Sequence, residues 1–477
     1  MSSIARRTAT LGFARLAKQS VIFVTPIFLV RLLTVDQFGE YRDFLLYSTI
    51  ILMIVEFCAN SSLAYFVPRE PARENVYFTQ TTMFVLITSV VAAILVLSLG
   101  SYIPSEGVRA YKYELSLYTI VLCNLDAWEV LWVAKKQAIK VVYYSLTRLI
   151  IRTMSVVLAA YYFREVGQVI WTLVAVEAGR LVIMTVYAAR RKLLVAICDS
   201  ATVKAQLAFF GPLGASNLLY TANIYMGQLY ISTVMGPAML GVYTIGSYLQ
   251  PIVRIFRGSI GDVIMPEIAS KKDEPPKVAL VLWQRATVVY CVVMMPMAML
   301  LFYYADVVVS VLFTRAYIEA VPVFQIFVFL LIRECFDFAL PLRIVNRTDV
   351  FFYISALTVV ANLVLMLILF RFYGILGPAL AAVGARFLLA VGHATYTKKY
   401  CEYTIAELLP WLDIAKVAIL TIACATILVL GNRVALDPFV RMLVFSAIYT
   451  FVYIVALINI GIDDVRTFIL RALRFTR

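Results

Sequence analysis

Residues 82–103 read TMFVLITSVVAAILVLSLGSYI and contain no charged side chain. A hydrocarbon core about 30 Å thick is crossed by about 20 apolar residues in a helix, so this stretch predicts a transmembrane helix. Similar stretches fill the chain between short polar segments, and we expect about fourteen of them. The predicted spans are residues 11–33, 44–67, 82–103, 115–134, 141–163, 169–189, 207–235, 240–264, 286–304, 323–342, 350–372, 375–395, 414–430 and 439–460.

The composition of the chain excludes a water-soluble fold. Hydrophobic residues make up 63% of it and charged residues only 15%, whereas charged residues make up about 25% of an ordinary soluble domain. The chain therefore needs lipid around it. The apolar stretches are continuous, whereas the strands of a membrane barrel are about ten residues long and alternate apolar with polar. We therefore predict an all-α, polytopic membrane protein.

The formal charge of +14 is concentrated in alternate loops. If the N-terminus is cytoplasmic, most of the cations fall in cytoplasmic segments, for example Arg190, Arg191 and Lys192 between the sixth and seventh predicted spans. This bias follows the positive-inside rule and predicts that both termini are cytoplasmic. The rule accounts for most of the basic excess, so we expect no nucleic-acid partner.

The residue types needed for metal binding and catalysis are scattered. The seven cysteines occur singly, without a C-x-x-C pair, and His393 is the only histidine. The H-E-x-x-H, G-x-x-x-x-G-K-[ST] and G-x-S-x-G motifs are absent. We therefore predict no metal site, no cofactor and no enzymatic activity. Transport by this chain would draw on an ion gradient or on the membrane potential.

Two segments of the chain resemble each other. Residues 38–41 read Phe-Gly-Glu-Tyr after the first predicted span, and residues 241–243 read Gly-Val-Tyr after the seventh. Because each half holds an even number of spans, the repeat is parallel, and such a repeat places a cavity between two lobes. The predicted parts are a six-helix N-terminal lobe at 1–195, a six-helix C-terminal lobe at 196–400, and two additional helices with a basic tail at 401–477.

Residues 31–41, RLLTVDQFGEY, and the opening Arg7-Thr8-Ala9 carry a family resemblance. With the two halves and the terminal pair of spans, the chain resembles the polysaccharide transporters of the multidrug/oligosaccharidyl-lipid/polysaccharide (MOP) flippase superfamily over nearly its whole length. The resemblance implies a flippase that moves undecaprenyl-pyrophosphate-linked oligosaccharides for O-antigen, capsule or exopolysaccharide across a bacterial inner membrane by alternating access. It implies as partners the lipid-linked substrate, membrane lipid, and a polysaccharide polymerase with export machinery.

Two other functions stay open at this point. A drug/cation antiporter of the same superfamily would favour a cavity with net acidic charge. A membrane-embedded oligosaccharide polymerase or glycosyltransferase usually needs a large outer loop, and every predicted outer loop here is short. The candidate cavity residues on the first, seventh and eighth spans are basic, which favours the flippase.

Charged residues within the predicted spans are candidates for function, because a charge near the bilayer centre costs at least about 2.5–3.5 kcal/mol. Glu177 and Arg180 are three residues apart, and Arg333 and Asp337 are four apart. Each pair therefore shares a helix face. We interpret both as structural ion pairs.

Three acidic residues, Glu56, Asp126 and Glu129, are candidates for ion coupling. Asp126 and Glu129 share a helix face and repel each other, which tends to raise the pKa of one and suits a proton or Na⁺ site. They are equally open to pairing with Arg148 or Arg152 on the next span.

A polar stripe marks the eighth predicted span. Arg254 lies roughly 21 Å along that span from Leu240 at a rise of about 1.5 Å per residue, too deep for comfortable snorkelling. Arginine suits a pyrophosphate because it stays charged and offers a planar fork of donors. The alternative for Arg254 is a structural pair with Glu56 or Asp337. The alternative for Arg15 and Lys18 on the first span is that their side chains snorkel to the membrane surface. The predicted cavity residues are Arg254, Arg257, Gln250, Asn217, Gln228, Arg15 and Lys18.

Overall fold

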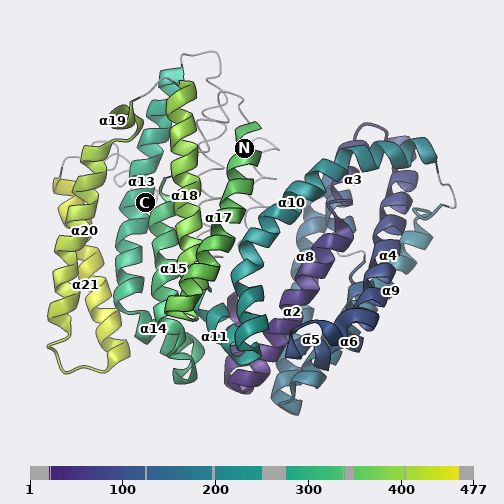
Figure 1. Ribbon diagram of the computed structural model, residues 1–477, viewed down its shortest axis with the longest axis horizontal. Helices are drawn as coiled ribbons and strands as arrows, with labels where there is room; N and C mark the ends of the chain where they lie inside the picture. Colours follow the sequence, from purple (N-terminus) through teal and green to yellow (C-terminus); the bar gives the residue numbers. More distant parts are fainter. Residues whose placement is uncertain are drawn as a thin grey trace. The chain divides into compact units, whose positions relative to one another are not determined.

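The structure, a computed structural model, describes residues 21–460 except residue 22 and residues 124–125, 196–198, 250–275, 337, 339–348 and 402–403. The chain divides into two compact units, unit 1 (Met1–Thr244) and unit 2 (Ile245–Arg477). Both are built from helices, and no strand occurs in the described residues (Figure 1). The all-α fold predicted from the composition is confirmed. The lobe boundaries at residues 195 and 400 stay a prediction.

Unit 1 begins with a helix over Phe23–Leu32. Its helix α2 starts at Val35 because Thr34 caps it: the Thr34 side chain accepts from Gln37 N, and the Gln37 side chain accepts from Thr34 N. The further elements are α3 Ser61–Phe66, η1 Pro71–Arg73, α4 Glu74–Leu99, η2 Gly100–Tyr102, α5 Glu106–Ala110, α6 Lys112–Val121, α7 Ala127–Ala134, α8 Ala138–Phe163, α9 Val166–Arg190, α10 Ser200–Met235 and α11 Pro237–Gly246, which runs across the boundary of the units.

Unit 2 has α20 and α21 along one edge, where α21 packs on α13 (Figure 1). Tyr453 on α21 donates to the carbonyl of Val292 on α13, and Tyr303 on α13 donates to the carbonyl of Leu428 on α20. The elements of unit 2 are α13 Pro276–Tyr303, α14 Ala305–Phe313, η3 Arg315–Tyr317, α15 Ala320–Glu334, α17 Asp349–Tyr373, α18 Leu376–Cys401, α19 Ile405–Leu408, α20 Trp411–Gly431 and α21 Pro438–Asn459.

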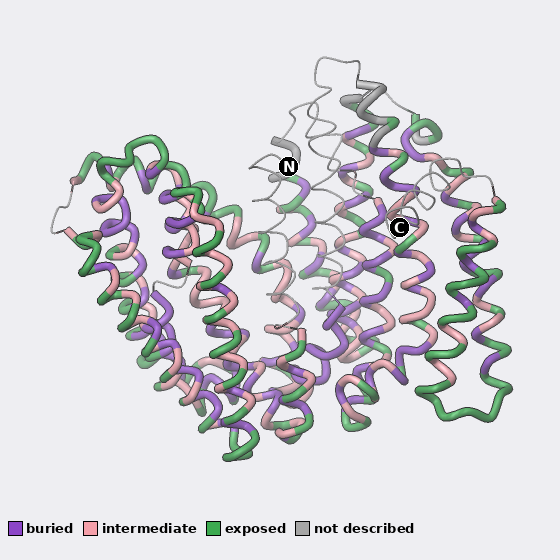
Figure 2. Tube along the Cα trace, turned by 180° about the vertical axis from the view of Figure 1, so that it is seen from behind, coloured by how far each residue is buried: buried purple, intermediate pink, exposed green. Residues whose placement is uncertain are grey.

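Eight helices in the described part of the chain are long and apolar enough to cross a membrane. Their outer faces are apolar: Ile87 on α4, Leu357 on α17 and Phe451 on α21 are all more than half exposed. Figure 2 shows this exposure as green on the outward faces of the helices. Such a surface fits lipid rather than water. The eight spans are consistent with the predicted fourteen, and the full number stays a prediction.

Two of the predicted spans are broken in the structure. The span predicted at 44–67 consists of α2 and α3, separated by Phe57 and Cys58 in the left-handed backbone region, with φ of 41° and 61°. The span predicted at 115–134 consists of α6 and α7. Hydropathy averages over such breaks, because they are only a few residues long and lie between apolar helices.

Helix α10 begins at Ser200, earlier than the predicted start at Leu207. Asp199 caps it by accepting from Ala201 N, and the same carboxylate receives a bond of 2.7 Å from Arg73 Nη2. Asp199 lies outside the membrane spans, and hydrogen bonds from Thr202 and Arg73 lower the pKa of its carboxyl group. The cap therefore extends the helix beyond its apolar part and ties its start to η1.

The repeated Gly-x-Tyr segments meet in unit 1. Gly241 on α11 lies so close to Gly39 on α2 that a Cβ on Gly241 would stand 3.2 Å from the Gly39 Cα atom. A Cβ on Gly39 would overlap the carbonyl group of Pro237. The two motif glycines therefore permit a backbone approach that any side chain would prevent.

Asp43 fastens three helices of unit 1 together. Its carboxylate is fully buried and accepts 2.5 Å hydrogen bonds from Ser105 Oγ, before α5, and from Ser232 Oγ on α10. Gly107 lets α5 approach, since a Cβ there would clash with the Asp43 carboxylate. A buried carboxylate with two donors satisfies the rule that buried polar groups are hydrogen-bonded.

Candidate functional site

Glu177 on α9 is the centre of a buried ion network in unit 1. Its side chain is fully buried, and each of its carboxylate oxygens faces an arginine. Arg180 Nε donates to Oε2 at 2.6 Å, and Arg148 Nε on α8 lies 3.5 Å from Oε1. The pairing of Glu177 with Arg180 expected from their spacing is therefore one half of a three-residue arrangement.

Arg180 makes two further contacts that hold it in place. Its Nη1 donates to the Tyr144 hydroxyl at 3.2 Å, and its Nη2 donates to the Val121 carbonyl at 3.2 Å. Val121 is the last residue of α6, where helix carbonyls lose their partners within the helix. The guanidinium thus satisfies a backbone acceptor that the break between α6 and α7 leaves open.

Arg148 connects this pair to a second group of acids. Its Nη1 lies 3.9 Å from Glu129 Oε1 on α7, and its charge also acts on Glu56, the last residue of α2. Asp126 lies near enough to Glu56 for the two carboxylates to repel each other. Arg148 is therefore shared between Glu177, Glu129 and Glu56. Its contact with Glu129 corresponds to the alternative that Asp126 or Glu129 pairs with Arg148 or Arg152.

Glu56 is an acid of this network whose carboxylate is incompletely hydrogen-bonded. One of its oxygens, Oε1, is buried and has no hydrogen-bond partner among the described residues. It stands at the end of α2, next to the left-handed residues Phe57 and Cys58, and Asp126 stands at the start of α7. Acids placed at breaks in transmembrane helices, next to open backbone groups, occur where transporters bind ions.

The structure does not describe most of the predicted cavity. Arg15, Lys18, Gln250, Arg254, Arg257 and Asp337 lie outside the described residues. Asn217 and Gln228 are described, and both are half-buried on α10. Asn217 is within hydrogen-bonding reach of the Cys58 thiol, two residues from Glu56 in the chain, so Asn217 lies near the ion network.

Arg333 in unit 2 is buried beside Glu334, and Asp337, its predicted partner, lies outside the described residues. Its Nη1 lies 3.1 Å from Glu334 Oε1, and its Nε donates to the Arg386 carbonyl at 3.1 Å. Adjacent residues do not normally face each other on a helix, so the spacing pointed to Asp337. Glu334 is the last residue of α15, and at this helix end its carboxylate meets the Arg333 guanidinium.

Unit 2 also carries an apolar groove between α13 and α21. Its volume is about 330 Å³, and Pro296, Tyr449 and Tyr453 belong to its lining. The groove suits a hydrocarbon chain. Within the described residues, no group of three or more His, Cys, Asp or Glu gathers closely enough to hold a metal ion.

The fold defines a class of protein: an all-helical membrane protein. The structure resembles that of the lipid II flippase MurJ in an inward closed conformation, with a TM-score of 0.69 and 13% identity over 97% of this chain and 100% of that chain. It also resembles an inward-facing multidrug resistance MATE family transporter of the MOP superfamily, with a TM-score of 0.58 and 10% identity over 82% and 98% of the two chains. The structure also resembles that of the eukaryotic MATE transporter AtDTX14, with a TM-score of 0.56 and 13% identity over 88% of this chain and 100% of that chain. At these identities the likeness shows the fold.

A family model then identifies the group within this class. The model described as polysaccharide biosynthesis protein matches residues 28–322, more than half of the chain, and the chain belongs to that family. No curated protein matches it in sequence. The resemblance drawn from residues 31–41 and the repeat is confirmed at the level of this polysaccharide family, and the chain shares its fold with a transporter of the MOP superfamily.

Proposed function

We propose that the chain translocates an undecaprenyl-pyrophosphate-linked oligosaccharide across a bacterial inner membrane by alternating access. The observation that carries the proposal is membership of the polysaccharide biosynthesis protein family. Polysaccharide biosynthesis needs a sugar carrier that crosses the membrane, and the fold is shared with a lipid II flippase. An apolar groove in unit 2 fits the hydrocarbon part of such a substrate.

The pyrophosphate would be held by the cations of the predicted cavity. Arg254 is our first choice, with Arg257 one turn away, because a guanidinium at mid-depth pairs with an anion through two parallel hydrogen bonds. Half-buried amides on α10 would hydrogen-bond the sugar. The proposed contacts are Arg254, Arg257, Arg15, Lys18, Gln250, Asn217 and Gln228.

The flippase proposal is tested by reconstitution. The purified protein is placed in liposomes that contain an undecaprenyl-pyrophosphate-linked oligosaccharide, and a lectin added outside reports the sugars that have crossed. We expect crossing by the wild type and its loss in Arg254→Ala. The matched control is Arg371→Ala, which removes an exposed arginine at the end of α17. Full crossing by Arg254→Ala would overturn the role of that residue, and efflux of a cationic dye without sugar crossing would favour the antiporter.

We propose that Glu56 and Asp126 carry the coupling proton. Glu56 has a buried oxygen without a partner, and a second carboxylate lies close to it. Two nearby carboxylates hold one proton more readily than two negative charges. Glu129 is a weaker candidate because Arg148 balances its charge.

The coupling proposal is tested with an imposed pH gradient in the same liposomes. The gradient should accelerate transport by the wild type and should have no effect on Glu56→Gln, whose amide keeps the shape and cannot exchange a proton. Glu106→Gln, an exposed acid on α5, is the matched control. If Glu56→Gln responds to the gradient as the wild type does, the coupling group is elsewhere.

We also propose that both termini are cytoplasmic, from the charge bias of the loops. Reporter fusions at the C-terminus and within residues 35–40 should be found on opposite sides of the membrane. Reporters found on one side would contradict this topology.

A further inference from the structure

A pocket of about 410 Å³ opens at one end of unit 1, and none of the acids of the ion network belongs to its lining. The lining comes from the start of α4, the end of α7, the start of α8 and the end of α9. Helices α4, α8 and α9 are three of the eight candidate membrane spans, and their ends meet here. The pocket therefore lies where these spans leave the membrane.

The charges that line the pocket are strongly unbalanced. Four cations, Lys135, Lys140, Arg191 and Lys192, line it together with one acid, Glu74. Lys135 Nζ is paired with Glu74 at 2.8 Å. In the part of the chain that the structure describes, the other three cations form no ion pair. The pocket thus presents a net charge of about +3 to a ligand, from four positive groups and one negative group.

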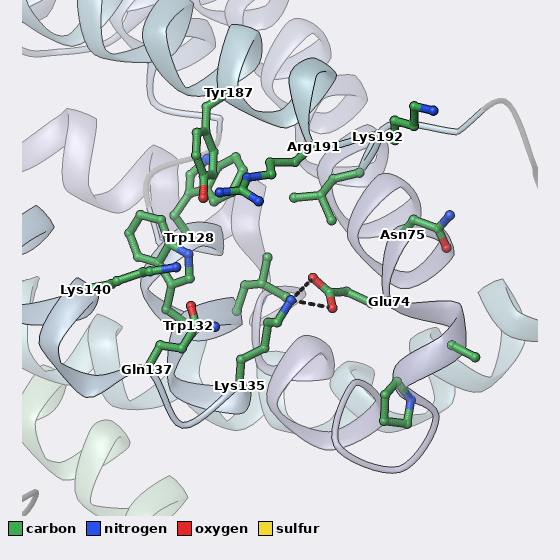
Figure 3. A pocket seen from close by; sticks show the side chains of 14 residues that line it. Glu74, Asn75, Trp128, Trp132, Lys135, Gln137, Lys140, Tyr187, Arg191 and Lys192 are labelled. Carbon is green, nitrogen blue, oxygen red and sulfur yellow. Dashed lines mark hydrogen bonds and ion pairs between the residues drawn. The ribbon is translucent and has the colours of Figure 1, made fainter.

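The aromatic lining of the pocket holds an unused hydrogen-bond donor. Trp128 is 1% exposed and belongs to the lining, yet its indole Nε1 has no hydrogen-bond partner among the described residues. Figure 3 shows Lys140 and Arg191 extending toward the Trp128 and Tyr187 rings, while Lys135 faces Glu74. Arg191 Cζ lies 5.6 Å from the centre of the Tyr187 ring. A buried donor without an acceptor costs about 1–3 kcal/mol, which an anionic oxygen in the pocket would recover.

We propose that this pocket binds the phosphate headgroup of an anionic membrane phospholipid. Each part of such a ligand has a matching group here. Lys140 and Arg191 face the phosphate charge, the Trp128 N–H donates to one of its oxygens, and the acyl chains leave along the apolar faces of the spans. A volume of about 410 Å³ lies within the usual range for a small-molecule site. Its lining includes none of the residues proposed to hold the transported substrate, and the proposal does not depend on that substrate.

The proposal is tested by native mass spectrometry of the full chain, released from detergent micelles after incubation with lipid. The probes are dioleoylphosphatidylglycerol, dioleoylphosphatidylcholine and inorganic phosphate. We expect the wild type to retain phosphatidylglycerol in preference to phosphatidylcholine. Each cation near an anionic lipid strengthens binding about fivefold, so Lys140→Gln with Arg191→Gln should weaken phosphatidylglycerol binding about 25-fold.

Two matched variants separate the pocket from general surface charge. Arg190→Gln with Lys204→Gln removes the same charge from exposed positions outside the lining and should leave binding unchanged. Trp128→Phe keeps a six-membered aromatic ring and removes the N–H donor together with the five-membered ring, and should weaken binding at least about fivefold. Thermal unfolding of each variant, followed by circular dichroism, reports whether the fold is kept.

Three results would overturn the proposal. The first is equal retention of the two lipids by the wild type, which needs no variant. The second is an equal loss of binding in the control pair and in the pocket pair. The third is displacement of phosphatidylglycerol by millimolar inorganic phosphate, which would show that the pocket takes free phosphate rather than a lipid headgroup.

Discussion

Replacing Glu177 with Ala should destabilise unit 1 strongly, because two arginines would lose their shared counter-ion. Removing one partner of a buried pair costs about 3–5 kcal/mol. Arg180 would keep the Tyr144 hydroxyl and the Val121 carbonyl, and Arg148 would keep Glu129 at 3.9 Å. These remaining partners favour the lower limit, about 3 kcal/mol, or about a 150-fold change in the unfolding equilibrium.

The assay is equilibrium unfolding of the purified protein in mixed micelles, with the change in the free energy of unfolding as the readout. Asp413→Ala is the matched control. It also removes the acid of an i,i+3 pair, with Lys416, but the two side chains are 35% and 34% exposed. An exposed pair contributes about 1 kcal/mol or less, so the control should lose far less stability than Glu177→Ala.

A double variant sharpens this test. If the loss in Glu177→Ala comes from uncompensated buried charge, then adding Arg180→Leu should restore part of the stability, because one stranded charge is removed. The reasoning is refuted if Glu177→Ala lowers the free energy of unfolding no more than Asp413→Ala does. It is also refuted if adding Arg180→Leu to Glu177→Ala lowers the free energy of unfolding further, by as much as Arg180→Leu does alone.

Three further changes test the helix contacts of unit 1 by the same unfolding measurement. Gly39→Ala should cost about 1–3 kcal/mol, because its Cβ would overlap the Pro237 carbonyl and push α2 from α11; no loss would contradict the close approach. Asp43→Ala should cost about 2 kcal/mol or more by leaving two buried serine hydroxyls without their acceptor, and a neutral result would show that another acceptor takes over. Asp199 has a lowered pKa because of hydrogen bonds from Thr202 and Arg73. The Asp199 carboxylate therefore stabilises the fold above its ordinary pKa of 3.8, and this contribution is lost as the pH falls through the lower pKa of the folded state. Asp199→Asn should not show this loss of folding stability at acid pH. If the stability of Asp199→Asn falls at acid pH in the same way as that of the wild type, the role of the cap is contradicted.

The sequence was sufficient for the fold class, for the eight long apolar spans in the described part of the chain, and for the family. Length and hydropathy determine the fold class and the spans, and they do not depend on how side chains meet. The breaks at Phe57 and between α6 and α7 could not be predicted, because tertiary contacts hold apolar residues there outside regular helix. The local signals in the sequence are weak: Asn60 in the first break, and Asn124 and Asp126 in the second.

The candidate site was predictable only as far as spacing along one helix carries information. The i,i+3 relation predicted the pairing of Glu177 with Arg180, and their side-chain atoms lie 2.6 Å apart. The roles of Arg148 and Tyr144 depend on how α8 packs against α9, which periodicity does not give. Glu334 was missed because adjacent residues rarely pair on a helix. The unsatisfied indole of Trp128 has no sequence signature, since it depends on the groups that surround the ring.

The contact between Gly39 and Gly241 bears on the predicted repeat. The two glycines hold equivalent places in the two predicted repeats, and a Cβ on Gly241 would stand 3.2 Å from the Gly39 Cα atom. Each position therefore limits the size of the residue at the other. A larger residue at either position should be tolerated only where the opposing backbone has moved away.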